Sequence, residues 1–361
     1  MAVTTTRRRR PTLDDVADAV GVSRATVSNA YNRPDQLSAQ LREEVLRAAK
    51  KIGYAGPDPT ARSLATSRTG AIAVLLDTNL STAFSDPALS LTLDALSTVV
   101  DPEGHALLLL PGDGESGGPR PERILTAQAD IAVACSLADG APALNAVRDR
   151  GLPLVVIDQP HIRGSARIGV ADRAGAAAAA RHLVELGHRR IGIFSAQCLS
   201  APRGGELSIA EASDSRFHDN RERMAGYLET LAEAGIPAAD VPIWEASGLS
   251  VEGAMPSAFG LLNRQPRPTA LLCMSDLLAL AAISAARHLG LSVPGDLSVV
   301  GFDDVPPAQW SEPPLTTVRQ DLAAKGRAAG DLVLGLLRGE KVPAPAEVPA
   351  ELVVRGSTAP A

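Results

Sequence analysis

TLDDVADAVGVSRATVSNAYN, residues 12–32, decides how the start of this chain folds. Thr12 and Asp15 have the T-x-x-D spacing of a capping box, and apolar residues recur behind them at helical spacing. Gly21 suits the left-handed conformation that commonly ends a helix, and Ser23 is a good N-cap for another. We therefore predict two short helices joined by a tight turn.

The outward face of the second helix carries no carboxylate and consists of Arg24, Ala25, Ser28, Asn29 and Asn32. Arginine can pair bidentately with guanine and asparagine with adenine, while a small apolar side chain can contact the thymine methyl group. This helix is therefore predicted to lie in a DNA groove. The alternative is an ordinary helical hairpin within a small bundle.

Ser38 is predicted to cap a third helix over residues 39–53, which completes a three-helix headpiece over residues 12–56. Residues 57–69 follow, with a helix too short to be stable alone. They form either a plain linker or a hinge helix that folds on DNA and inserts Leu64 into the minor groove.

Charge is distributed unevenly along the 361 residues. Residues 1–70 hold 12 Lys and Arg against 7 Asp and Glu, whereas the remainder holds 23 against 34. A basic head on an acidic body indicates that the head alone meets a polyanion. Residues 1–11 are predicted to be a disordered basic tail.

Several classes of protein are disfavoured by what the sequence lacks. The three cysteines are far apart, so we expect neither a metal site nor a disulfide framework, and no cofactor. There is no signal-peptide pattern and no 18-residue apolar run, so we expect no membrane partner and a cytoplasmic location at the nucleoid. No phosphate-loop or nucleophile-elbow motif is present, and we expect no enzymatic activity.

From Ala71 onward, short apolar runs alternate with helical stretches. The predicted strands are 71–76, 106–110, 130–135, 153–158, 190–195, 269–274 and 297–304, and the predicted helices lie near 87–100, 139–150, 172–187, 220–234, 251–263 and 275–289. This alternation predicts parallel sheets covered by helices. Two similar lobes are expected: lobe 1 about 70–170 plus 304–317, and lobe 2 about 171–303 plus 318–355.

Polar residues follow several of these strands or open the next helix, where parallel sheets present their ligand crevice. The candidate ligand contacts are Asp158, Asp172, Arg223, Ser275, Asp276 and Asp303. Carboxylates facing an arginine suit a polyhydroxylated ligand, because a hydroxyl both donates and accepts. Helix capping is the favoured interpretation of Asp172 and Asp276 taken singly, whereas Arg223 and Asp303 are the stronger ligand candidates.

The chain resembles the lactose/galactose-repressor family of bacterial transcription regulators over nearly its whole length. The resemblance rests on TLDDVADAVGVSRATVSNAYN, ARSLATSRTG, RHLVELGHRRIGIF, RERMAGY, LSVPGDLSVVGFDD and PPLTTVRQD, in that order. It implies an all-α helix-turn-helix headpiece with a hinge helix, then a two-lobed α/β sensor similar to type I periplasmic binding proteins over residues 70–355.

The resemblance also implies roles for individual residues. Bases would be read by Arg24, Ala25 and Asn29, and Leu64 would be the wedge. The DNA backbone would be held by Ser23, Thr26, Ser28 and Asn32, and the other expected DNA contacts are Thr12, Ser38, Tyr54 and Ala61.

Three features depart from the family pattern. Many members have arginine in place of Asn29, one extra residue separates Tyr54 from Leu64, and Ser275 stands where many place asparagine. The expected function is nevertheless a homodimeric repressor of a near-palindromic double-stranded DNA operator, controlled by a sugar-like effector. The alternative is a solute-binding protein with a vestigial DNA-binding head.

Overall fold

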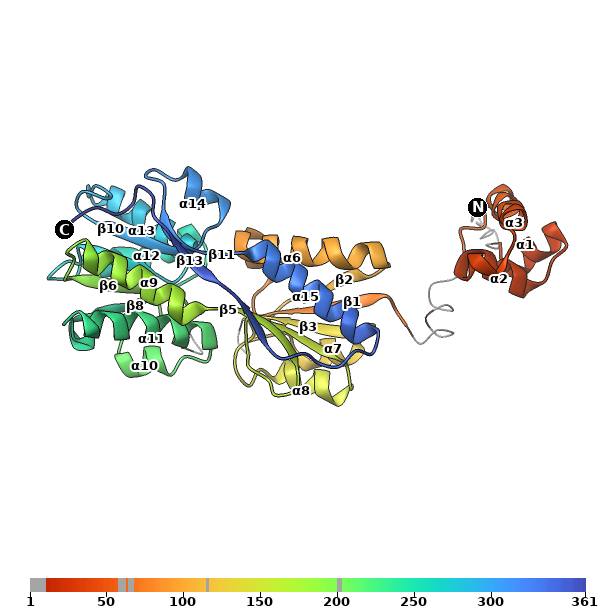
Figure 1. The fold of residues 1–361 in the computed structure, drawn as a ribbon, viewed down its shortest axis with the longest axis horizontal. Coiled ribbons are helices and arrows are strands. Elements are labelled where there is room, and N and C mark those ends of the chain that lie inside the picture. Colours follow the sequence, from red (N-terminus) through yellow and green to blue (C-terminus); the bar gives the residue numbers. More distant parts are fainter. Residues whose placement is uncertain (1–10, 58–62, 64–67, 115–116, 200–202) are drawn as a thin grey trace, which may run out of the picture. The chain divides into compact units, whose positions relative to one another are not determined.

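The computed structural model describes residues 11–57, 63, 68–114, 117–199 and 203–361, except for the side chain of Pro34 (Figure 1). The predicted basic tail and most of the predicted hinge helix, including Ala61 and Leu64, lie outside these residues. The chain divides into two compact units, Met1–Thr69 and Gly70–Ala361.

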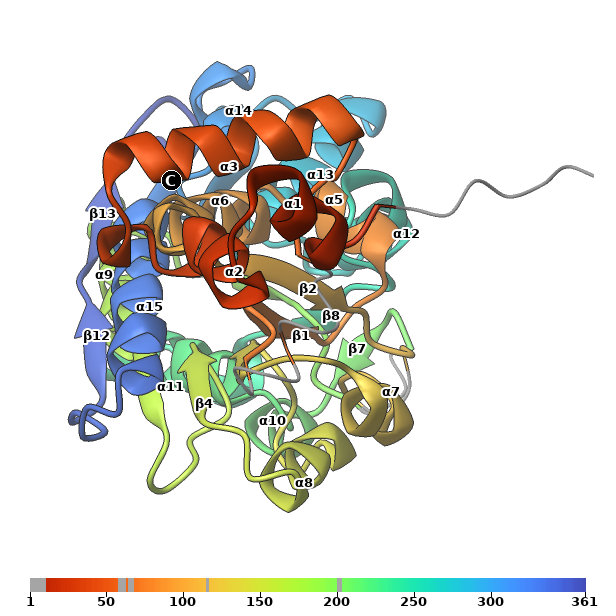
Figure 2. The ribbon, with the colours of Figure 1, turned by 90° about the vertical axis from the view of Figure 1, so that its right-hand side faces the viewer.

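The first unit contains the three predicted helices. They are α1 (Leu13–Val20), α2 (Arg24–Asn32) and α3 (Ala39–Ile52), with a 3₁₀ turn at Pro34–Gln36 (Figure 2). Both halves of the capping box form at the start of α1, where the Thr12 hydroxyl accepts from the Asp15 amide (3.4 Å) and the Thr12 amide donates to Asp15 Oδ2 (2.7 Å). Gly21 ends α1 with φ +75°, so the predicted turn is confirmed.

The three helices close a small core of buried Val16, Ala17, Val27, Ala30, Val45 and Ala49. Each helix contributes two of these residues, and the pairs of α2 and α3 are three and four positions apart, which is the spacing of one helix face. Tyr54 extends the core by packing edge-on against Tyr31, with ring centroids 6.0 Å apart.

Lobe 1 of the second unit is built on a six-stranded parallel sheet. Its order is β12 (Ala346–Val348), β5 (Ala166–Val170), β4 (Leu154–Ile157), β3 (Ile131–Cys135), β1 (Ala71–Leu76) and β2 (Ala106–Leu110). Helices α6 (Pro87–Val100) and α15 (Leu322–Leu337) cover one face, and α7 (Pro121–Thr126) and α8 (Pro142–Asp149) cover the other. Alternate residues of β1 enter the two cores, as a two-sided buried strand requires.

Close helix packing stabilises this lobe. Gly326 of α15 faces α6 so closely that a Cβ there would lie 2.3 Å from the carbonyl oxygen of Thr92. A glycine at this position lets the two helices lie side by side (Figure 1).

Lobe 2 has a seven-stranded sheet. Its order is β13 (Ala350–Val353), β11 (Thr316–Gln320), β10 (Ser298–Asp303), β9 (Ala270–Cys273), β6 (Ile191–Ser195), β8 (Ile243–Glu245) and β7 (Glu206–Leu207), antiparallel only at its two edges. Helices α9 (Asp172–Glu185) and α11 (His218–Glu233) pack together, as do α12 (Val251–Leu262) and α13 (Asp276–His288). Three short helices complete the unit: α5 (Leu80–Ser85), α10 (Ile209–Ser213) and α14 (Pro306–Trp310).

The chain passes between the lobes three times: at Ala171, at Asp321 and at Pro349. The predicted allocation is therefore wrong for residues 304–317 and for residues 321–349, whereas 318–320 and 350–353 lie in lobe 2 as predicted. Strand β11 belongs to lobe 2 because it pairs with β10, whereas α15 belongs to lobe 1 because it packs on α6. Hydrophobic pattern alone gives no information on which of two similar sheets a late strand joins.

Candidate DNA-reading surface and effector cleft

The exposed side of α2 forms a continuous polar surface on the headpiece. Arg24, Ala25 and Asn32 are exposed, and Thr26, Ser28 and Asn29 are half-buried. The opposite side of α2 is fixed by buried Val27 and Ala30, which orients the polar side outward.

Hydrogen bonds hold several of these side chains in place. The Ser23 hydroxyl caps α2 by accepting the amide of Thr26 at 3.1 Å. Asn29 donates to Gln36 Oε1 (3.3 Å) and Asn32 donates to Ser28 Oγ (3.2 Å). Arg24 has only a loose exposed contact of 3.8 Å with Asp14, so its guanidinium can move to a base or a phosphate.

The caps of the other two helices occupy further predicted positions. Thr12 caps α1 and Ser38 caps α3, where its hydroxyl accepts the Leu41 amide at 3.3 Å. N-terminal amides of helices suit phosphate oxygens, so these positions fit the backbone contacts expected of them. Tyr54 is half-buried against Tyr31.

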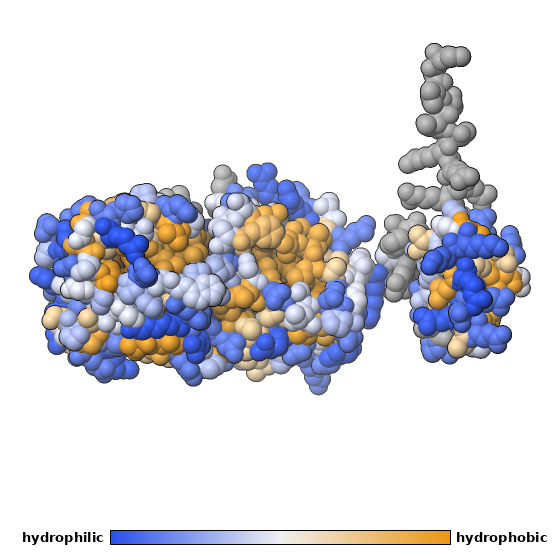
Figure 3. Space-filling view, turned by 90° about the horizontal axis from the view of Figure 1, so that it is seen from above, coloured by the Kyte–Doolittle hydropathy of each residue, from blue (hydrophilic) through white to orange (hydrophobic). Residues whose placement is uncertain are grey.

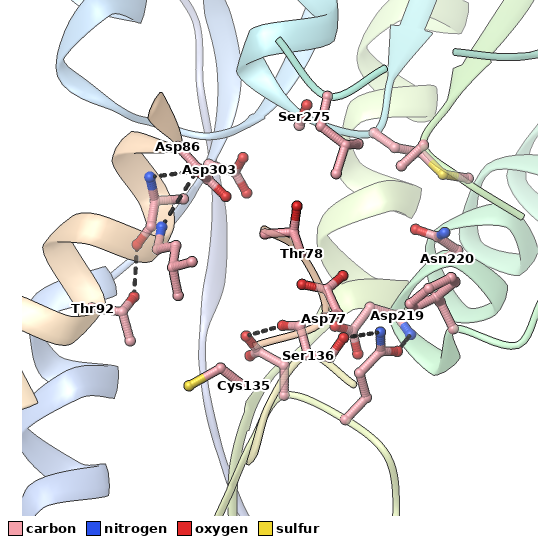
Figure 4. Close-up of a pocket in the computed structure, with 18 of the residues that line it drawn as sticks. Asp77, Thr78, Asp86, Thr92, Cys135, Ser136, Asp219, Asn220, Ser275 and Asp303 are labelled. Atoms are coloured by element: carbon pink, nitrogen blue, oxygen red, sulfur yellow. Dashed lines mark hydrogen bonds between the residues drawn. The ribbon is translucent and has the colours of Figure 1, made fainter. Parts of the chain in front are cut away.

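A cavity of about 210 Å³ lies where the two lobes meet (Figure 4). Lobe 1 supplies its wall from the ends of β1, β3 and β4 and from α6, and lobe 2 supplies residues from β10 and α11. Carboxylates, amides and hydroxyls dominate the polar part of the lining. The site therefore sits at the carboxyl ends of parallel strands, as sheets of this type predict.

Strained backbone marks the strand ends at this cavity. Ser136, Asp158 and Asp303 line it with positive φ values of 52°, 64° and 119°, which side-chain-bearing residues rarely adopt. Strain of this kind costs roughly 1–3 kcal/mol per residue and concentrates at ligand sites, where it aims a side chain.

Arg223 of α11 is the centre of the lobe 2 wall. Its Nε donates to Asp172 Oδ1 at 2.7 Å, its Nη1 donates to the carbonyl of Met274 at 2.5 Å, and its guanidinium lies 3.7 Å from the centroid of the Phe302 ring. Asp303 Oδ1 is 4.0 Å from Nη1. These contacts fix the guanidinium plane at the cavity wall.

Lys325 of α15 is the corresponding cation of lobe 1. Its ammonium donates to both carboxylate oxygens of Asp158, at 3.0 and 2.8 Å, and to Gln320 Oε1 at 2.8 Å. Gln320 in turn donates to Asp303 Oδ1 at 2.6 Å. This chain of contacts connects a carboxylate of lobe 1 to one of lobe 2.

Burial in this acidic cavity raises the pKa of several carboxyls. The pKa of Asp77 rises to about 7 through burial and the nearby Asp86, and that of Asp303 rises to about 7 through burial, which Arg223 partly offsets. Burial raises the pKa of Asp219 well above its usual range. The cavity thus disfavours negative charge on its own carboxyls.

Side chains also connect the lobes beside the cavity. The Asp219 amide of lobe 2 donates to Gln159 Oε1 of lobe 1 at 2.9 Å. Arg221 of lobe 2 forms an ion pair of 2.8 Å with Asp139 of lobe 1. With three covalent crossings, these contacts make a hinge between the lobes.

Comparison with known proteins gives the same two-part organisation. Residues 12–56 match the family of bacterial regulatory proteins of lacI type, and residues 180–358 match a periplasmic binding protein-like domain. The chain is 41% identical over 332 residues to HTH-type transcriptional regulator Rv3575c of Mycobacterium tuberculosis, covering 91% of this chain and 92% of that protein. The chain belongs to the LacI family. It is a DNA-binding transcriptional regulator.

Solved LacI-family structures share the architecture. A lac repressor dimer bound to operator and the anti-inducer ONPF is 26% identical, with a TM-score of 0.78 covering 97% of this chain and 100% of that one. A complex of the transcriptional regulator CelR with cellobiose is 27% identical, with a TM-score of 0.69 covering 96% and 100%. The LacI-like headpiece and two-lobed sensor predicted from the sequence are confirmed.

Four of the six predicted effector residues line the cavity of this LacI-family sensor: Asp158, Arg223, Ser275 and Asp303. Asp172 and Asp276 do not. Asp172 is buried against Arg223, and Asp276 accepts the Val305 amide at 2.8 Å and the Thr317 hydroxyl at 2.5 Å. Both carboxylates hold the framework behind the site.

The capping interpretation of these two aspartates is wrong as well. The N-cap of α9 is Ala171, without a side-chain bond, and the N-cap of α13 is Ser275, whose hydroxyl accepts the Leu278 amide at 3.3 Å. Both carboxylates therefore bond to residues distant in the sequence and do not cap their own helices.

The charged and amide residues of the lining that the sequence analysis missed include Asp77, Asp86, Asp219, Gln320 and Lys325. Asp77 directly follows the first predicted strand, so the rule that selected Asp158 would have selected it too. Lys325 carries no such signal, because its helix reaches the cavity only after the second crossing of the chain, at Asp321.

Within the described ranges, no group of three or more His, Cys, Asp or Glu side chains could hold a metal ion. Among the helices that the structure describes, none combines the length and apolar character needed to cross a membrane.

Proposed function

We propose that the protein is a homodimeric repressor that binds a two-fold symmetric operator and is controlled by a sugar-like polyol in the interlobe cavity. The observation that carries the proposal is a polar cavity built by both lobes at a hinge. A compound that contacts both walls changes the relative free energy of open and closed lobes. Because its target is chromosomal DNA, the protein acts in the cytoplasm at the nucleoid.

Base reading is assigned to Arg24, Ala25 and Asn29 of α2. Arg24 is exposed and loosely held, and the amide of Asn29 keeps its weak 3.3 Å bond only to an exposed glutamine. Ser23, Thr26, Ser28 and Asn32 are placed to contact the DNA backbone along the same surface. Leu64 is assigned the minor-groove wedge on the sequence pattern.

The polyol effector is supported by the cavity chemistry. Asp158, Arg223, Ser275 and Asp303 offer acceptors and donors from both lobes, which matches hydroxyl groups that donate and accept at once. The cellobiose complex of the similar regulator CelR supports a carbohydrate. We propose that the bound compound is released unchanged.

The dimer partner is a second copy of this chain. Large apolar side chains are exposed on lobe 1 (Leu80, Phe84, Leu91 and Leu108) and on lobe 2 (Trp310), with Phe84 68% and Trp310 78% exposed. Figure 3 shows apolar residues gathered on one face of the sensor lobes. The similar lac repressor structure is a dimer bound to operator, and two headpieces match a two-fold symmetric site.

The dimer is tested by sedimentation velocity on Phe84→Asp and Trp310→Asp. Each buried charge should shift the protein towards monomer. Val354→Asp, at another exposed apolar position, is the control and should leave the dimer intact. Wild-type protein that sediments as a monomer at micromolar concentration contradicts the proposal.

The regulatory function is tested by binding-site selection from random DNA, followed by footprinting with and without a panel of sugars and polyols. A two-fold symmetric site from which one compound releases the protein is the expected result. Arg223→Gln should keep the site and lose the response to that compound. A site that forms only with a compound makes it a co-repressor, and a specific site that no polyol alters contradicts the effector assignment.

A further inference from the structure

The cavity contains far more negative than positive side chains. Five carboxylates line it: Asp77, Asp86, Asp158, Asp219 and Asp303. Among the described lining residues, the cations are Arg223 and Lys325. A ligand therefore meets an excess of acceptors, and the question is whether either cation is available to it.

Lys325 is fully occupied by the protein. An ammonium group has three N–H donors, and those of Lys325 reach the two oxygens of Asp158 and the side-chain oxygen of Gln320 at 2.8–3.0 Å. An incoming anion would have to break contacts made at the ordinary length of charge-assisted hydrogen bonds.

Arg223 is partly occupied: two of its five N–H donors bond to the protein. Its Nε is committed to Asp172 and its Nη1 to the Met274 carbonyl, while the Phe302 ring lies against the guanidinium plane. Asp303 at 4.0 Å also screens it from a ligand anion. The Nε side of the guanidinium is therefore committed to Asp172, and any anion that approached Nη1 would lie close to the Asp303 carboxylate.

Three lining carboxylates have no cation within 4.0 Å among the described residues, and one of them, Asp86, accepts instead from the amides of Ala88 and Leu89 at 2.9 and 3.3 Å. The other two are Asp77 and Asp219. No described Lys, Arg or His nitrogen lies within 4.0 Å of the carboxylate of Asp77 or of Asp219. Asp77 follows β1 in lobe 1 and Asp219 lies at the start of α11 in lobe 2, so each wall has an acceptor without a cationic partner (Figure 4). Hydroxyl donors of a ligand would satisfy them.

We propose that the effector is an unphosphorylated polyol and that the cavity rejects its phosphate ester. The inference rests on the proposed function and specifies the ligand of the same cavity. Like charges brought together in a desolvated site repel strongly, and such repulsion is a common source of specificity. The protein thus reports the free compound, the substrate of a phosphorylating reaction rather than its product.

The test uses the full chain at pH 8, where a phosphate monoester carries nearly two negative charges. The probes are inorganic phosphate, D-ribose with D-ribose 5-phosphate, and D-glucose with D-glucose 6-phosphate, each followed by calorimetry and by phosphorus NMR line broadening. Wild-type protein should bind none of the phosphorus compounds. If a polyol of the set binds, this should hold up to about 20-fold above the concentration at which that polyol saturates the protein. If none binds, it should hold up to roughly 20 mM.

The matched variants decide the cause. The double variant Asp77→Asn/Asp219→Asn should gain saturable binding of inorganic phosphate by at least about 10-fold, because at pH 8 the Asp77 carboxyl lies above its pKa of about 7 and carries a repelling charge that the variant removes. Glu233→Gln/Asp240→Asn removes two exposed charges outside the cavity and should bind phosphate no better than wild type. Failure of the cavity double variant to gain phosphate binding overturns the role given to these two carboxylates.

The outcomes separate this inference from the proposed function. Saturable binding of phosphate or a phosphate ester by wild type, lost in Arg223→Gln, overturns the inference. If that ester also releases the protein from the operator, the proposed regulatory function stands and its effector is a phosphorylated compound. Release of the protein from the operator by a free polyol, with no response to the phosphate ester of that polyol, confirms both the inference and the proposed function.

Discussion

Arg223→Gln should destabilise the sensor strongly and in a pH-dependent way, because it leaves Asp172 buried without its cation. The Asp172 side chain is 6% exposed and its one ion pair, at 2.7 Å, is with Arg223. Breaking a buried pair costs roughly 3–5 kcal/mol. Here the carboxyl can avoid part of that cost by taking up a proton.

The magnitude follows from that proton. Burial raises the pKa of Asp172 even with Arg223 present, and the variant removes the charge that lowers it. If the carboxyl is protonated in the folded variant at pH 7 and has a pKa near about 3.9 in the unfolded chain, it must take up a proton on folding. This proton uptake lowers the free energy of unfolding by about 4 kcal/mol, at 1.36 kcal/mol per pH unit. The expected loss in melting temperature is about 8 °C for a domain of this size.

The sign of the pH dependence is fixed by the same reasoning. The folded variant binds a proton that the unfolded chain releases, so its free energy of unfolding falls as pH rises between the unfolded and folded pKa values. The deficit relative to wild type should therefore shrink by roughly 1.4 kcal/mol for each unit of pH lowered from 7 to 5. Urea unfolding at pH 5, 6 and 7 measures it.

A second variant makes the argument falsifiable. Asp172→Asn in the Arg223→Gln background removes the titrating carboxyl and should recover most of the pH 7 loss with little pH dependence. A deficit that is equal at pH 5 and pH 7, or one below about 1 kcal/mol at pH 7, would show that the carboxyl remains solvated in the variant.

Three further changes test other parts of the molecule. Gly326→Ala should lower the free energy of unfolding by roughly 1–3 kcal/mol, since the added Cβ would lie 2.3 Å from the carbonyl oxygen of Thr92. Thermal unfolding measures the loss. The control is Gly205→Ala, which should be neutral because an added Cβ there would have no atom within 4 Å. Ser23→Ala removes the cap of α2 and should lower headpiece stability by about 1 kcal/mol, seen as faster amide exchange in that helix. Asp77→Asn should raise the melting temperature more at pH 8 than at pH 5, because the folded carboxyl, with its pKa raised to about 7, opposes ionisation only at the higher pH; an equal shift at both pH values contradicts this.

The sequence by itself determined the elements whose causes are local. Caps at Thr12, Ser23 and Ser38 and the glycine turn at Gly21 place the headpiece helices, since each cap satisfies amides within three residues of it. Buried runs such as residues 71–76 become parallel strands because both faces must be covered. Strand ends then indicated Asp158 and Asp303 as cavity residues.

Only the tertiary structure decided which lobe each late segment joins and which charged side chains pair. The chain crosses between the lobes at Asp321 and Pro349, which brings Lys325 onto Asp158, 167 positions earlier in the sequence. Asp172 and Asp276 look like helix caps locally, yet partners 51 and 41 residues away bind them more strongly. Local hydrogen bonds can be read from neighbouring residues, whereas ion pairs of this kind depend on which distant surfaces folding brings together.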